Sequence, residues 1–124
     1  MELVKGITSD NELIELAKKL NIHIDDILTI DEVKKPLPKG SYIILLRRGN
    51  GVGHWVCCHN GEWFDSTGIG PPAVFGKMRY NQIQYQSTYS EHCGIYCILW
   101  LYSKQKNRPT LLSGFTNFDI DFVN

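Results

Sequence analysis

The dipeptide Asn60-Gly61 constrains the fold of this chain more than any other feature of its sequence. It separates the mostly apolar residues 54–59 from a second such run at 62–65. Both central residues of a type I′ turn need a positive φ, which Asn and Gly tolerate best, so the pattern predicts a β-hairpin with a two-residue loop. In that register His54 and Asp65 share one face as diagonal neighbours, roughly 7–8 Å apart at the backbone and within reach of each other's side chains.

A carboxylate beside an imidazole supplies two parts of a nucleophilic triad, and Cys93 is the candidate for the third. It stands between the polar residues 87–92 and an apolar run at 93–102, which predicts a buried helix that becomes polar at 103–106. A thiol at the amino terminus of a helix lies near the positive end of the helix dipole, which favours its thiolate form. The sequence therefore predicts a cysteine nucleophile paired with a histidine.

Groups around Cys93 can stabilise the oxyanion that forms when a thiolate attacks a carbonyl carbon. The backbone N–H of Cys93 would be one donor, and Gly94 would let the substrate backbone approach closely. A side-chain amide from Gln82, Gln84 or Gln86, which all lie just upstream, would be the second donor.

Two further elements are clear from the pattern. Residues 9–12 have the form of a capping box and are followed by apolar side chains at helical spacing, so a helix is expected from about 10 to 20. Asn21 should close this helix in the left-handed conformation. The unbroken apolar run at 41–46 suits a central strand that is covered on both faces.

The other segments have weaker patterns. Residues 22–35 should form an irregular connection with one short helical turn near Asp31, and 47–53 a glycine-rich turn. An extended surface loop is expected at 66–72 and another strand at 80–86. The sequence predicts an α+β fold: a central mixed or antiparallel sheet packed against the buried helix that starts at the cysteine, with one more helix near the amino terminus.

The composition predicts one soluble domain over residues 1–124. Hydrophobic residues make up 43% of the chain, enough for an ordinary core, and 13 basic residues balance 13 acidic ones. Nothing in that balance argues for binding nucleic acid or an anionic membrane surface. The longest apolar run, 95–102, is too short to cross a bilayer. Adjacent Cys57 and Cys58 would point to opposite strand faces, which favours free thiols in a reducing, intracellular compartment.

Taken in order, these residues resemble the adenovirus-type maturation proteases and the wider group that includes the SUMO-deconjugating proteases. The order in that group is His-Trp, then an acid, then a Gln a few residues before Cys-Gly. The matching residues here are His54-Trp55, Phe64-Asp65, Gln86 and Cys93-Gly94-Ile95-Tyr96-Cys97. The stretch from 31 to 55 also resembles the small proteases of virophages and related mobile elements. The resemblance covers residues 20–105.

The resemblance implies a role for each matching residue. Cys93 would be the nucleophile, and His54 would act as the general base and later as the general acid. Asp65 would orient the imidazole. Gln86 would bind the oxyanion together with the Cys93 N–H. The fold would be adenain-like, and similar to papain in the geometry of its site.

The resemblance also implies a substrate. Trp55 and Gly94 would lie beside the substrate. Enzymes of this kind cut viral precursor proteins, such as capsid proteins, during particle maturation, often beside glycine, so the protein would work in the virion and in the viral factory of the host cytoplasm. The alternative is an isopeptidase that removes a ubiquitin-like modifier.

For partners and cofactors we expect little beyond the substrate. No metal or other cofactor, no nucleic acid and no membrane is expected, and the protein should be a monomer. Stimulation by DNA is not expected because this chain is neutral where the adenovirus enzymes are basic. A free thiol at Cys57 or Cys58 leaves a disulfide-linked peptide cofactor open.

Other interpretations of the same residues remain open. Cys93 could be an inert buried cysteine, Asp65 could cap the turn that follows it, and Gln86 could be an exposed strand residue. Trp55 could serve core packing alone. A non-catalytic binding domain on the protease fold is a further possibility.

A zinc-binding module is a different class of alternative. Its candidate ligands are His54, Cys57, Cys58, His59, Cys93 and Cys97. Structural zinc sites usually present paired ligands two to four residues apart, which adjacent cysteines do not provide. We expect His59 to face solvent, and we expect His23 and Cys97 to be structural. His92, next to the cysteine, should project in another direction.

Overall fold

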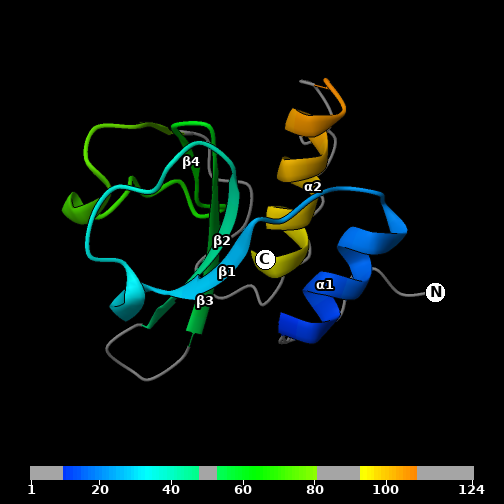
Figure 1. The fold of residues 1–124 in the computed structure, drawn as a ribbon, viewed down its shortest axis with the longest axis horizontal. Helices are drawn as coiled ribbons and strands as arrows, with labels where there is room; N and C mark the ends of the chain where they lie inside the picture. The colour runs from blue at the N-terminus through cyan, green and yellow to red at the C-terminus, as the bar shows by residue number, and fades with distance from the viewer. Residues whose placement is uncertain (1–9, 48–52, 81–92, 109–124) are drawn as a thin grey trace, which may run out of the picture.

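The structure is a computed structural model that describes residues 10–47, 53–80 and 93–108. Within these residues it is an α+β protein with a five-stranded mixed sheet, as the sequence predicts (Figure 1). The elements in chain order are α1 (Asp10–Lys19), β1 (Asp26–Thr29), the 3-10 helix η1 (Ile30–Glu32), β2 (Ser41–Arg47), β3 (Gly53–His59), β4 (Glu62–Phe64), the 3-10 helix η2 (Ala73–Phe75), β5 (Arg79–Tyr80) and α2 (Cys93–Gln105).

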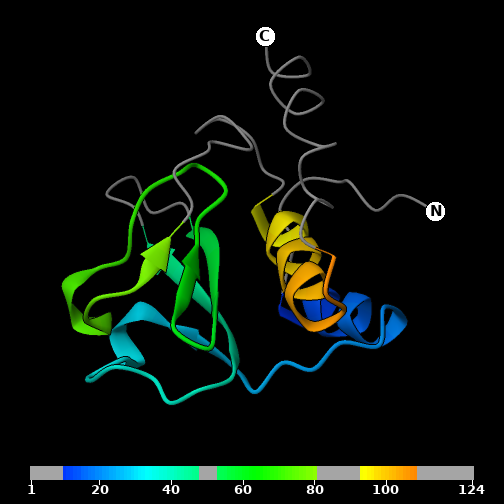
Figure 2. The ribbon, with the colours of Figure 1, turned by 90° about the horizontal axis from the view of Figure 1, so that it is seen from above.

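The strands lie side by side in the order of the chain, from β1 to β5. The β2–β3 and β3–β4 pairs are antiparallel, whereas the outer pairs β1–β2 and β4–β5 are parallel. Figure 2 shows both helices on one side of this sheet. Helix α2 packs on β3 and α1 packs on α2. The central position of β3 therefore places it against the helix that begins at Cys93.

The hairpin between β3 and β4 has the predicted register. Asn60 and Gly61 have φ angles of 48° and 84°, as a type I′ turn requires. His59 pairs with Glu62, and the ladder continues through Cys58–Trp63 and Cys57–Phe64. The two-residue loop thus sets the faces of both strands, which confirms the prediction.

Alternation along β3 divides its side chains between two cores. Cys57 joins the core on the helix side, whereas Cys58 lies in a second core on the other side of the sheet, so the two thiols point apart as predicted. On the helix side the Phe64 ring stacks on Trp100 with centroids 5.3 Å apart. Helix α2 is buried along most of its length, as its uniformly apolar sequence predicts.

Helix α1 ends as the sequence predicts. Leu13 and Ala17 face the helix-side core. Asn21 adopts a φ of 56°, its N–H bonds to the Lys18 carbonyl, and the Ile22 N–H bonds to the Ala17 carbonyl. These are the two hydrogen bonds of a Schellman motif. Ser9, the expected cap at the other end, lies outside the described residues. No helix in the described parts of the chain has the length and apolar character needed to cross a membrane.

The expectation of an irregular connection at 22–35 is wrong in part. The segment contains β1, which pairs with β2 along the edge of the sheet. This strand is short and is half-buried without alternation, so its sequence lacks a strand pattern. Its Ile27 and Thr29 N–H groups are bonded to the carboxylates of Asp26 and Glu32. The helical turn expected near Asp31 is present as η1.

The segment after β4 also departs from the expected surface loop. Ser66 and Thr67 are buried, and only from Gly68 onward does the chain become exposed. The reason is that Asp65 draws the start of the loop inward through hydrogen bonds. Of the strand expected at 80–86, Tyr80 belongs to β5 and residues 81–86 lie outside the described residues, as does most of the glycine-rich turn.

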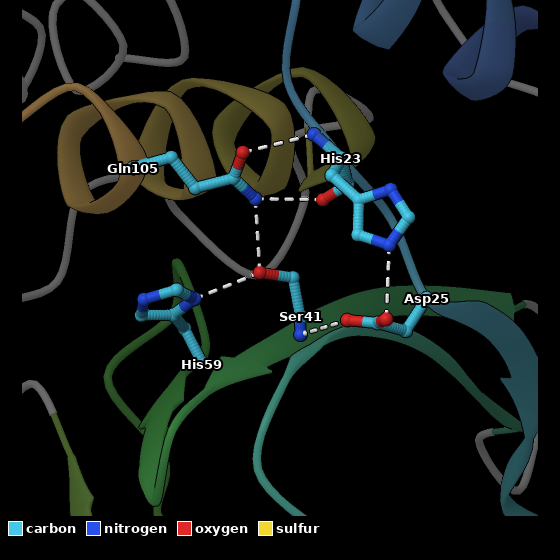
Figure 3. A network of polar contacts seen from close by, with 5 residues as sticks. All are labelled: His23, Asp25, Ser41, His59 and Gln105. Carbon is cyan, nitrogen blue, oxygen red and sulfur yellow. Dashed lines mark hydrogen bonds and ion pairs between the residues drawn. The ribbon is translucent and has the colours of Figure 1, made fainter.

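The carboxyl end of α2 is tied to the sheet by polar contacts around Gln105 (Figure 3). Its amide oxygen accepts the His23 N–H at 2.8 Å, and its nitrogen donates to the His23 carbonyl at 2.6 Å and to Ser41 Oγ at 2.9 Å. Ser41 Oγ lies 2.7 Å from His59 Nδ1. This hydroxyl thus joins the Gln105 amide to the imidazole of His59. We call these four residues the Gln105 clasp.

Two histidines in this clasp differ from expectation. His59 was expected to face solvent, yet it is half-buried because its ring reaches back over β2 to Ser41. His23 was expected to be structural, but its ring is exposed and lies 2.9 Å from Asp25. His23 has a structural role through its backbone, because its N–H and its carbonyl are both hydrogen-bonded to the Gln105 side chain.

The Gln105 clasp should make stability depend on pH. Burial, followed by the charge of Lys104, lowers the pKa of His59 below its usual 6.5. When the pKa of a histidine is lower in the folded than in the unfolded protein, its neutral form contributes stability at pH values above the unfolded-state pKa. This contribution is lost as the pH falls below that pKa. We predict that, between about pH 7.5 and 5.5, falling pH lowers the free energy of unfolding of the wild type relative to that of His59→Gln, which keeps a hydrogen-bonding side chain beside Ser41. Denaturant titrations with equal pH slopes for both proteins would contradict this.

Candidate active site

The start of β3, the end of β4 and the start of α2 bring three buried side chains together. His54 Nε2 lies 2.7 Å from Asp65 Oδ1, so the contact that the hairpin register predicts is present. The Cys93 thiol also lies near enough to the imidazole to help raise its pKa. Because Nε2 faces Asp65, the ring nitrogen left for the thiol is Nδ1. The exposed fractions of His54, Asp65 and Cys93 are only 5%, 2% and 7%, so bulk water screens these contacts weakly.

The position of Cys93 follows from how α2 packs. It is the first residue of the helix, where backbone N–H groups lack partners within the helix and the helix dipole is positive. The Trp55 backbone N–H donates to its Sγ at 3.3 Å. The thiol therefore lies beside a backbone donor, a helix terminus and an imidazole.

The charge state of His54 follows from its two partners. Burial by itself lowers the pKa of the imidazole, but the hydrogen bonds and charges of Asp65 and Cys93 raise it to about 9. The ring is therefore an imidazolium at neutral pH. It can donate one proton to the carboxylate and hold the other beside the sulfur.

Asp65 is held in its charged form. Burial raises the pKa of this carboxyl, but hydrogen bonds from His54 and from Thr67 outweigh burial and hold the pKa below its usual value. Thr67 contributes both its backbone N–H, 2.8 Å from Oδ1, and its hydroxyl, 2.6 Å from the same oxygen. The structure thus places a carboxylate, an imidazolium and a thiol in series.

The other predicted site residues are placed as follows. Trp55 is buried in the same core cluster as Cys93, and Gly94 is buried in the first turn of α2. Gln86, the expected oxyanion donor, lies outside the described residues, as do the competing glutamines and His92. The described residues therefore include the cysteine, histidine and aspartate that the sequence predicts as nucleophile, base and orienting carboxylate, and the predicted side-chain oxyanion donor lies outside them.

Sequence reasoning missed two contributors to this site. One is the Trp55 backbone N–H, which carries no residue-type signal because any residue except proline supplies it. The other is Thr67 as a buried part of the site. The sequence did leave open that Asp65 caps the turn after it, and the Thr67 N–H makes that hydrogen bond, but the same residues were expected in a surface loop.

The remaining thiols do not share this environment. Cys57 and Cys97 are fully buried, and burial raises the pKa of both. Burial also raises the pKa of Cys58 to about 12. Across the residues that the structure describes, no three His, Cys, Asp or Glu side chains converge as metal ligands. The six residues of the zinc alternative are spread over both faces of the sheet.

The site holds the groups that nucleophilic chemistry by a thiol requires: a thiol, an imidazolium beside it and a carboxylate that orients the imidazolium. No family model matches the chain, and neither a curated protein nor a solved structure matches it.

The contrast between the four thiols predicts selective alkylation. Stoichiometric iodoacetamide at neutral pH should modify Cys93 first, because its sulfur contacts an imidazolium whereas burial keeps the other three protonated. Peptide mapping by mass spectrometry identifies the modified residue. Uniform labelling of all four cysteines, or first labelling of Cys58, would contradict this view of the site.

Proposed function

We propose that the protein is a cysteine peptidase in which Cys93 is the nucleophile, His54 the proton carrier and Asp65 the residue that orients it. The observation that carries this proposal is the buried series of contacts from the Asp65 carboxylate through the His54 imidazole to the Cys93 sulfur. Charged groups are costly to bury unless they are paired, so a buried carboxylate–imidazolium–sulfur series is expected where it serves a function.

In the first half of the proposed reaction, the Cys93 thiolate attacks the carbonyl carbon of the scissile peptide bond. A carbon–sulfur bond forms, and the carbonyl electrons move to the oxygen, which becomes an oxyanion. The tetrahedral intermediate then collapses and the carbon–nitrogen bond breaks. His54 gives its proton to the departing amine, and a thioester remains on Cys93.

In the second half, water attacks the thioester carbon. Neutral His54 takes a proton from this water, the carbon–sulfur bond breaks, and the carboxylic acid product leaves. The imidazolium–thiolate pair is then restored. Asp65 supports both halves by keeping the ring in one orientation and by stabilising its positive charge.

The oxyanion would be stabilised at the start of α2. The Cys93 N–H belongs to the first turn of the helix, whose donors and dipole favour negative charge. We propose Gln86 as the second donor on the basis of the sequence resemblance alone. An arrangement similar to that of papain is likewise part of the proposal.

For the substrate we propose viral precursor proteins, cut at sites that contain glycine. Support comes from the motif order in the sequence and from the glycine at position 94, which has no side chain to obstruct a substrate backbone. A panel of glycine-containing peptides, viral capsid precursors and conjugates of ubiquitin-like modifiers tests this choice. If only the conjugates of ubiquitin-like modifiers are cleaved, the protein is a deconjugating isopeptidase and the endopeptidase proposal is wrong.

Replacing the nucleophile should abolish cleavage. We predict that Cys93→Ala lowers peptidase activity to background, because no other described thiol contacts His54, whereas Cys58→Ala keeps activity within about twofold. Cys58 is the matched control because it is also a buried cysteine, but on the far face of the sheet. Activity is measured by mass spectrometry of cleaved peptide. Equal cleavage by wild type and Cys93→Ala would show that Cys93 is not the nucleophile.

The activity should also have a defined alkaline limit. Because the pKa of His54 is raised to about 9, its proton is present below that pH and is lost above it, so kcat/KM should fall as the pH rises through about 9. Asp65→Asn removes the charge that holds this proton, so the limit should move toward about 6.5, the ordinary histidine value. An unchanged alkaline limit in Asp65→Asn would contradict the assigned role of the carboxylate.

A further inference from the structure

One oxygen of Asp65 has three polar contacts in this site, one to His54 and two to Thr67. Asp65 Oδ1 lies 2.7 Å from His54 Nε2, 2.8 Å from the Thr67 N–H and 2.6 Å from Thr67 Oγ1. Thr67 is itself buried, with 8% of its surface exposed. The donors from Thr67 and the imidazole therefore converge on the same atom in a region that bulk water does not reach.

We infer that Thr67 is a positioning residue of this site, which holds Asp65 Oδ1 where it can bind His54. The inference rests on the proposed function and adds to it a residue that does not touch the nucleophile. Thr67 acts through the carboxylate, and the carboxylate acts through the imidazole.

The physical reason is that a carboxylate turns easily about the bond that joins it to its Cβ. Hydrogen bonds from fixed donors remove this freedom. Thr67 is a suitable donor because its branched side chain has restricted rotation about χ1. Its backbone is also fixed, since the Gly68 N–H bonds to the Asp65 carbonyl at 2.8 Å and Gly68 adopts a φ of 84°. The loop that follows β4 thus presents two donors to one oxygen.

The neighbouring residue provides a matched control. Ser66 is fully buried, and its hydroxyl has no hydrogen-bond partner among the residues that the structure describes. Ser66→Ala therefore removes a buried hydroxyl from the same loop without removing a contact to Asp65. Thr67→Val removes the hydroxyl that does bind Asp65 while keeping the branched shape and the backbone N–H. Thr67→Ser keeps both donors.

The test is the titration of the His54 ring by NMR in the full chain with labelled histidine, assigned with His54→Gln. If Thr67 holds Oδ1 toward the ring, Thr67→Val weakens that contact and the His54 midpoint falls by about one pH unit, a roughly tenfold loss of proton affinity. Thr67→Ser and Ser66→Ala should titrate like the wild type. If peptidase activity is found, kcat should fall in Thr67→Val while KM stays the same.

A folded Thr67→Val protein whose His54 titrates at or above the wild-type midpoint overturns the inference. A loss of stability with an unchanged midpoint does so as well, because it shows a structural role only. If Thr67→Val does not fold, Thr67→Ala is judged by the same criterion. The titration needs no substrate, so a wild-type protein that cleaves nothing removes the proposed function and leaves the Thr67 inference to be decided by NMR.

Discussion

The packing of α2 between the sheet and α1 is the contact on which the rest of this structure depends. A helix that is apolar on nearly every side is stable in water only when it is covered on more than one side. Strand β3 covers one side and α1 another, and the stacked rings of Phe64 and Trp100 join the helix to the hairpin. This packing fixes the position of α2 along the direction of β3. It thereby places Cys93 at the Trp55 N–H, next to His54.

A second constraint is the cost of burying charge. His54 and Asp65 are nearly inaccessible to solvent, and removing either one would leave the other as an uncompensated buried charge. The fold meets this cost through short, directed hydrogen bonds to Asp65 from His54 and Thr67. Far from this site, the Gln105 clasp secures the opposite end of α2 with neutral groups. The helix is therefore anchored by a charged cluster at its first residue and by an uncharged network at its last.

Much of this arrangement is predictable from the sequence because local chemistry determines it. The positive φ angles at Asn60-Gly61 fix the hairpin register and, with it, the contact between His54 and Asp65. Strand β1 could not be predicted, since an edge strand that is half-buried on both faces has no periodic pattern. Burial of Thr67 was missed because it results from a carboxylate that draws a polar segment inward. The oxyanion donor Gln86 rests on the sequence resemblance alone.

The central claim is that the Cys93 sulfur forms a covalent acyl intermediate with help from His54. The most direct measurement is rapid acid quenching of the protein mixed with a peptide ester of a glycine-ending sequence, followed by intact and peptide-level mass spectrometry. The account predicts an acyl group bound as a thioester to Cys93, formed in the wild type and much more slowly in His54→Gln. Ester hydrolysis that leaves no acyl group on Cys93, or an acyl group that forms on another residue, would contradict it.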